Sequence, residues 1–65
     1  MENLGIGTRL VALRGDKSQK EVAAAVRVSR SALAMYERGE RVPRDEIKKR
    51  LSDYYNVSVQ QLFFD

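Results

Sequence analysis

Apolar residues recur along this chain at the spacing of helical faces. Two runs fall at i, i+4 and i+7, the spacing of one side of a helix: Ile6, Leu10 and Leu13, and later Ile47, Leu51 and Tyr54. Gly15-Asp16 ends the first run, and Asn56 is a suitable left-handed stop for the second. No stretch alternates apolar and polar residues as a half-buried strand would. The pattern predicts an all-α chain.

Three serines predict where the shorter helices begin. Ser18 opens an S-x-x-E capping box, which favours a helix over about residues 19–26. Ser29 caps the next helix, which Gly39 closes after about nine residues. A final turn or two of helix follows Ser58. Helices this short are marginal in isolation, so we predict a compact bundle of five helices that share one core.

The second and third predicted helices are joined by a very short turn. Their apolar sides can meet only if the helices cross steeply, with Ala23 small enough for close approach and Val28 as a hydrophobic pin in the turn. This is the geometry of a helix-turn-helix. If Leu33 and Tyr36 face inward, the opposite side of the third helix carries Arg30, Ser31, Ala34, Met35 and Arg38.

Charge favours a polyanionic partner for the middle of the chain. The formal net charge is only +3, but the excess is localised. Between positions 27 and 50, basic side chains outnumber acidic ones: Arg27, Arg30, Arg38, Arg41, Arg44, Lys48, Lys49 and Arg50 against Glu37, Glu40, Asp45 and Glu46. A basic patch of this kind suits the phosphates of a nucleic acid. We expect the Lys48-Lys49-Arg50 triplet itself to be a solvated face, with Glu46 and Arg50 as an ordinary i, i+4 pair.

The run SQKEVAAAVRVSRSALAMYERGERVP, preceded by IGTRLVALR and followed by NVSVQQLF, resembles the lambda-repressor and Cro-like helix-turn-helix proteins. The resemblance covers nearly the whole chain. It implies a single DNA-binding domain over residues 1–65 that docks its third helix in the major groove of double-stranded DNA and acts as a homodimer on a palindromic operator. The leading interpretation is therefore a bacterial or phage transcriptional repressor. The chain departs from the family pattern at Arg27, where glycine is usual, and at Glu40, where a basic residue often stands.

The resemblance also assigns residues to the DNA interface. It implies base readout by Arg30, Ser31 and Met35, phosphate contacts by Gln19, Arg38, Arg41 and Arg44, and a capping position for the recognition helix at Ser29. We add Ala34 to the expected base-readout residues and Ser29 to the expected phosphate contacts. Arg14 and Glu37 match a structural ion pair between the first and third helices.

The chemistry of these side chains supports several of the roles. Arginine can donate two parallel hydrogen bonds to guanine O6 and N7, which favours Arg30 for direct readout. Ser31 can bond a base or a phosphate, or only its own backbone. Met35 is either core filler or, with Ala34, an apolar contact for a thymine methyl group.

The aromatic residues near the C-terminus predict a second surface. Tyr36 and Tyr54 fall on inward sides of their helices, whereas Tyr55, Phe63 and Phe64 exceed what one side of a short helix can bury. We expect these three residues, with Leu62, to form an exposed apolar patch and a homodimer contact within about residues 58–65.

The composition argues against other classes of protein. Without cysteine or histidine, the chain lacks a disulfide framework, the usual transition-metal ligands and the usual nucleophile–base pairs. We expect no enzyme activity, metal, cofactor or small-molecule ligand. The longest apolar runs fall far short of the ~20 residues of a membrane span, which predicts a soluble, cytoplasmic, nucleoid-associated protein. The alternative function is a protein-interaction module, an antitoxin or adaptor on the same fold.

Overall fold

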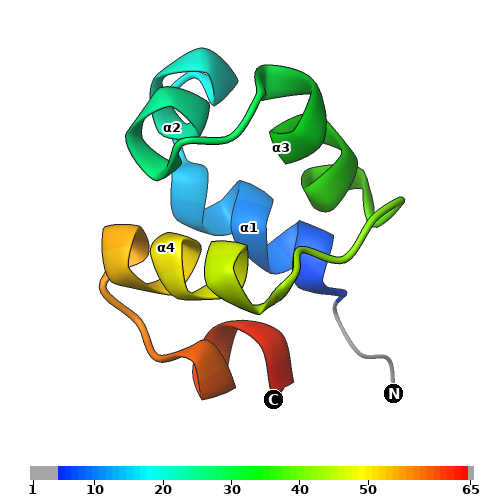
Figure 1. The fold of residues 1–65 in the computed structure, drawn as a ribbon, viewed down its shortest axis with the longest axis vertical. Helices are drawn as coiled ribbons and strands as arrows, with labels where there is room; N and C mark the ends of the chain where they lie inside the picture. Colours follow the sequence, from blue (N-terminus) through cyan, green and yellow to red (C-terminus); the bar gives the residue numbers. More distant parts are fainter. Residues whose placement is uncertain (1–4, 65) are drawn as a thin grey trace.

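The computed structural model describes residues 5–64, which fold into short helices joined by turns (Figure 1). The elements are α1 (Ile6–Arg14), α2 (Gln19–Val26), α3 (Arg30–Arg38), α4 (Asp45–Tyr55) and a final π-helical turn, η1 (Gln60–Phe64). The all-α prediction with five short helices is confirmed. Residues 1–4 and 65 of the predicted domain lie outside the described residues. Within residues 5–64, no helix has the length and apolar composition needed to cross a membrane.

The N-caps predicted for α2 and α3 are present. The Ser18 hydroxyl accepts a hydrogen bond from the Glu21 amide at 3.0 Å, and the Ser29 hydroxyl accepts one from the Ala32 amide at 2.9 Å. These bonds satisfy amides that have no partner inside the helix. Three helices end on left-handed residues: Arg27, Gly39 and Asn56.

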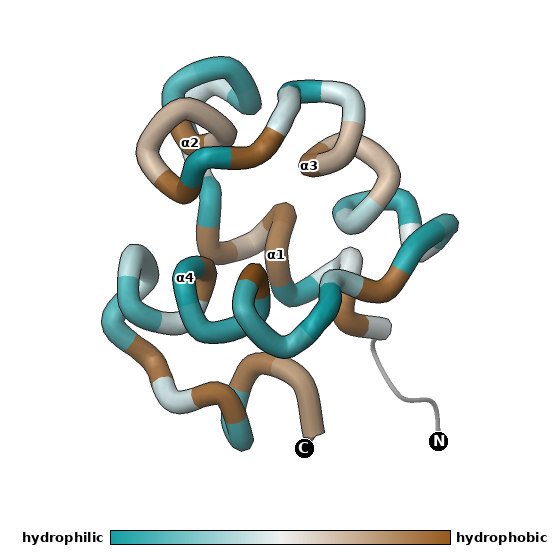
Figure 2. The backbone as a smooth tube through the Cα atoms, in the orientation of Figure 1, coloured by the Kyte–Doolittle hydropathy of each residue, from teal (hydrophilic) through white to brown (hydrophobic). Residues whose placement is uncertain are grey.

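The core is shared by all five elements. Figure 1 shows α1 across the middle of the molecule, with α2 and α3 on one side and α4 and η1 on the other. Hydrophobic stretches occur in every element (Figure 2), and the buried apolar side chains are Leu10, Val22, Ala23, Val26, Leu33, Tyr36, Ile47, Leu51, Leu62 and Phe63. Leu13 departs from its predicted inward position, because its side of α1 is only partly covered and leaves the residue 36% exposed.

A glycine in α1 allows this helix to pack closely on the end of α3. A Cβ atom placed on Gly7 would lie 2.2 Å from the backbone oxygen of Glu37, which is far inside van der Waals contact. Gly7 is itself buried within the helix. Any larger residue would therefore push α1 and α3 apart.

The prediction of an exposed C-terminal patch is wrong for most of its residues. Leu62 and Phe63 are only 2% and 6% exposed, and Tyr55 is half-buried against the core. The reason is that η1 folds back under α1, where Arg9 donates a hydrogen bond to the Leu62 carbonyl at 3.1 Å. Tyr55 therefore packs from α4, and Leu62 and Phe63 from η1, into the shared core. Phe64 alone of the four remains largely exposed, at 62%.

The Lys48-Lys49-Arg50 triplet on α4, expected to be a solvated face, mostly contacts other parts of the protein. The Lys48 ammonium lies 5.5 Å from the ring centre of Phe63 and 4.9 Å from that of Phe64, within the range of cation–π attraction. Lys49 is the residue that fits the expectation, since it is exposed and only loosely paired with Asp53 at 3.6 Å.

Arg50 reaches from α4 to the end of α2. Its guanidinium donates to the carbonyl oxygens of Val26 at 3.2 Å and Arg27 at 3.1 Å, and to the carboxylate of Glu46 at 2.6 Å. The predicted i, i+4 pair is present. Its arginine also satisfies carbonyls that the end of a helix leaves without partners.

Candidate nucleic-acid interface

The turn between α2 and α3 is a Schellman motif built on a non-glycine residue. Arg27 adopts φ 61° and ψ 49°, and its amide donates to the Ala24 carbonyl at 3.2 Å. The next amide, that of Val28, donates to the Ala23 carbonyl at 3.0 Å. Val28 also packs against the core, as predicted for the pin of a helix-turn-helix. Ser29 then caps α3, so three residues separate the two helices.

The third helix turns one side inward and leaves the opposite side open. Leu33 and Tyr36 are buried, as the sequence predicted. Ser31, Met35 and Arg38 follow one another at i, i+4 and i+7 on the side opposite Leu33.

The expected base-readout residues differ in exposure. Arg30 and Ser31 are exposed in the first turn of α3, whereas Ala34 and Met35 are partly covered. Among residues 5–64, Arg30 has no ion-pair partner. The first turn is thus the most accessible part of the helix.

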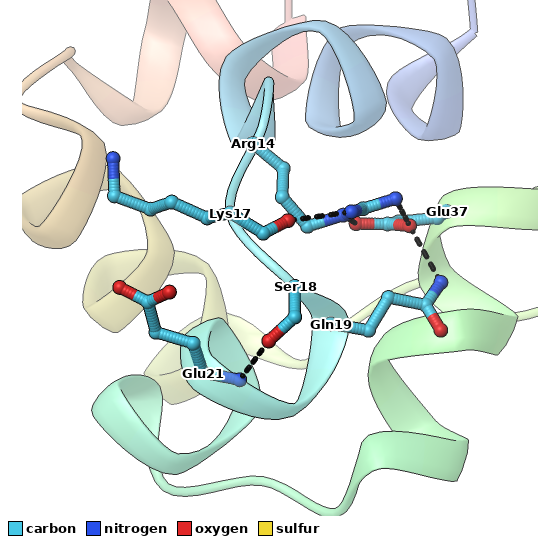
Figure 3. A network of polar contacts seen from close by, with 6 residues as sticks. All are labelled: Arg14, Lys17, Ser18, Gln19, Glu21 and Glu37. Atoms are coloured by element: carbon cyan, nitrogen blue, oxygen red, sulfur yellow. Dashed lines mark hydrogen bonds and ion pairs between the residues drawn. The ribbon is translucent and has the colours of Figure 1, made fainter.

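A partly buried polar network centred on Glu37 holds α1, α2 and α3 together (Figure 3). Arg14 donates to the Glu37 carboxylate through Nε at 2.8 Å and through Nη2 at 3.1 Å. Its Nη1 donates to the Lys17 carbonyl at 2.7 Å. The ion pair expected from the resemblance is therefore present, and hydrogen bonding to Glu37 raises the pKa of Arg14. Because the Glu37 residue is only 8% exposed, this is a position where loss of one partner leaves a buried charge.

Gln19 belongs to the same network. Its side-chain amide donates to Glu37 Oε1 at 2.8 Å, which ties the first residue of α2 to the last turn of α3 (Figure 3). The side chain was expected to contact a phosphate. One of its two N–H groups is thus already used inside the protein. The other N–H remains as a donor, together with the first-turn backbone amides that the Ser18 cap does not use.

The arginines at the end of α3 and in the segment that follows it fall into two groups. Arg38 forms a two-point ion pair with Glu40. Arg41 and Arg44 are exposed and have no ion-pair partner within the described part of the chain. Both line a cleft of about 480 Å³ between α3 and α4 that Arg27 and Arg50 also line. The other residues of its lining are apolar or aromatic: Val28, Ala32, Tyr36, Val42 and Ile47. Four arginines thus line this cleft.

The capped turn, the buried contact between α2 and α3, and the open side of α3 together define a helix-turn-helix domain. A model of the Helix-turn-helix family matches residues 10–62, which is most of the chain, so the protein belongs to this family, with the Cro/C1-type arrangement. The family indicates a transcription regulator that binds double-stranded DNA. A comparison with curated proteins finds none that matches.

Proposed function

We propose that the protein is a sequence-specific repressor that binds a palindromic operator as a homodimer and occludes promoter DNA. The observation that carries this proposal is the arrangement of α3. Its apolar side is fixed on the core, and its exposed first turn carries Arg30, which has no ion-pair partner among residues 5–64. A helix held in this way can enter the major groove without rearrangement.

Base readout is assigned first to Arg30. Its guanidinium can bond guanine O6 and N7 together, which discriminates by roughly 1–3 kcal/mol against other bases. Ser31 lies beside it and can bond a base edge or a phosphate. Ala34 and Met35 supply apolar contact for a thymine methyl group, over a smaller area because both are partly covered.

Phosphate contacts are assigned to groups on both sides of α3. Arg41 and Arg44 are the strongest candidates, since both are exposed and neither is neutralised by a carboxylate within residues 5–64. Gln19 and the amides of its helix end lie on the other side, where the positive end of a helix favours an anion. Ser29 keeps a hydroxyl proton that can be donated, because its oxygen acts as the acceptor in the cap.

The dimer is proposed from the symmetry of such operators rather than from a large apolar patch. Phe64 is the one predicted interface residue that is still largely exposed. The proposal predicts sedimentation that depends on protein concentration. A species that stays monomeric well above micromolar concentration, both free and on DNA, would exclude the dimer.

Selection of binding sites from random duplex DNA tests the function directly. We expect a recovered palindrome, which would support the ligand, the two-fold symmetry and base readout at once. Affinity should fall with salt at a log–log slope of about −0.9 for each phosphate neutralised. Recovery of no sequence, with no salt-dependent binding, would instead favour a protein-interaction module.

A further inference from the structure

An arginine and a glutamate close on each other at the end of α3. Arg38 donates from Nε to Glu40 Oε2 at 3.0 Å and from Nη2 to Glu40 Oε1 at 3.0 Å. Both donors on one edge of the guanidinium are therefore used by both oxygens of one carboxylate. The two side chains are 57% and 55% exposed, so the pair lies in solvent and not in the core.

The backbone places this glutamate. Gly39, with φ 76°, ends α3 in the left-handed region, and the amide of Glu40 donates to the Met35 carbonyl at 3.0 Å. These features make Glu40 the last residue of a Schellman motif, with its backbone fixed on the helix end. The carboxylate is thus held beside Arg38 by the cap that terminates the helix. Pairing in turn lowers the pKa of the Glu40 carboxyl group, which is ionised at neutral pH even without that shift.

Arg38 lies on the side of α3 that the proposed function turns toward DNA, in line with Ser31 and Met35. A carboxylate and a phosphodiester present the same kind of acceptor to arginine, two oxygens that take parallel hydrogen bonds. A DNA phosphate can therefore use this edge of Arg38 only by displacing Glu40. The displaced carboxylate would then remain close to the negatively charged backbone.

We infer that Glu40 is an intramolecular competitor for Arg38 that lowers the affinity of this surface for DNA phosphates and makes binding depend more on base contacts by α3. The inference rests on the proposed DNA-binding function. Its electrostatic basis is that an arginine already neutralised by a carboxylate releases no further counterions from DNA. Because the pair is exposed, solvent and salt screen it, so Glu40 competes for the guanidinium without locking it.

Glu40→Gln tests this role, with binding to a short mixed-sequence duplex measured over a range of salt concentrations. One additional phosphate contact should steepen the log–log salt slope by about 0.9 and tighten binding about 8-fold near 0.1 M salt. Asp53→Asn is the matched control, since it removes one negative charge from another exposed ion pair, on α4. We expect the control to change affinity much less.

A second pair of variants separates competition for Arg38 from simple loss of a negative charge. Arg38→Gln should weaken binding about 8-fold in the Glu40→Gln background. In the wild-type background, where the guanidinium is already occupied, the loss should be clearly smaller. Equal losses in the two backgrounds, or equal gains from Glu40→Gln and Asp53→Asn, would overturn the inference. Absence of salt-dependent binding in the wild type and all variants would contradict the DNA-binding proposal itself.

Discussion

The guanidinium of Arg50 in α4 donates a hydrogen bond to the backbone oxygen of Arg27, the left-handed residue that closes α2, at 3.1 Å. A second bond reaches the Val26 carbonyl, so a cation sits at the negative end of the α2 dipole. Through these contacts, α4 holds the turn that sets the angle between α2 and α3. The position of the proposed recognition helix therefore depends on a residue outside the helix-turn-helix.

Arg50→Ala should destabilise the protein by about 1–3 kcal/mol, because the carbonyls of Val26 and Arg27, the first of them in a partly buried contact, would lose a charged donor. The measurement is the free energy of unfolding in urea. Lys49→Ala is the neighbouring control, at a side chain that is 75% exposed and only loosely paired, and it should stay within about 0.5 kcal/mol of wild type. Equal effects of the two substitutions would show that the carbonyl contacts of Arg50 add nothing.

Arg27→Gly should leave the fold intact and DNA affinity nearly unchanged. Relief of the left-handed conformation favours glycine by about 1–2 kcal/mol, while the greater freedom of glycine in the unfolded chain offsets up to about 1 kcal/mol of that gain. Unfolding should thus show a stability equal to or slightly above wild type. A large loss of affinity with a flatter salt slope would mean that Arg27, which lines the basic cleft, contacts a phosphate.

Gly7→Ala should destabilise the protein by about 1–3 kcal/mol, because the new methyl group would meet the Glu37 backbone and force α1 away from α3. Elsewhere in a helix, alanine is favoured over glycine, so a loss of stability in Gly7→Ala would point to the close contact with α3 and not to helix propensity. Gly5→Ser adds a Cβ where no atom lies within 4 Å and provides an N-cap, and should be neutral or stabilising. Thermal unfolding of both variants compares the two sites, and a Gly7→Ala protein as stable as wild type would disprove the close-packing argument.

The helices could be predicted because their signals are local. Ser18 and Ser29 act on amides within one turn, and the left-handed stops at Gly39 and Asn56 need only their own backbone. The C-terminal segment could not be predicted in the same way. Periodicity describes one side of one helix, whereas Phe63 is buried between elements distant in sequence.

The polar contacts between helices also divide into those that the sequence predicted and those that it did not. The resemblance pointed to the pairing of Arg14 with Glu37, but nothing local connects Gln19 to that carboxylate, which is 18 residues away. Arg50 carried no signal beyond its pairing with Glu46, because its other partners are backbone carbonyls of a different helix. Such contacts depend on how α2 and α4 cross, which the spacing of apolar residues leaves open.

Arg30→Ala should relax sequence preference at one base pair in each half-site, with a loss of roughly 1–3 kcal/mol of discrimination there. Arg41→Ala is the contrasting variant. It should weaken binding to all sequences about equally and flatten the salt slope by about one unit, as expected for loss of one phosphate contact. Relative affinities measured over a library of sites distinguish the two effects. Unchanged relative affinities in Arg30→Ala would refute its assignment to base readout.

Tyr55 should make the folded state sensitive to alkaline pH. Burial, and then the nearby Glu37 carboxylate, raise the pKa of its phenol from 10.0 to about 12. The folded state therefore favours the neutral phenol, and its contribution to stability is complete below about pH 10 and is lost as pH rises through about 12.

In the wild type, the free energy of unfolding should accordingly fall between near-neutral pH and about pH 11, and Tyr55→Phe should make that fall shallower because no phenol remains to ionise. Lysines also titrate in this range, so the slope must be compared with that of Tyr54→Phe, which removes the hydroxyl group of the adjacent tyrosine and keeps its ring, packed 5.1 Å from that of Tyr55. Urea unfolding followed by circular dichroism at both pH values gives the change in unfolding free energy for the wild type and for each of the two variants. If Tyr55→Phe and Tyr54→Phe lose stability equally on going to high pH, burial of the Tyr55 phenol does not control the alkaline limit.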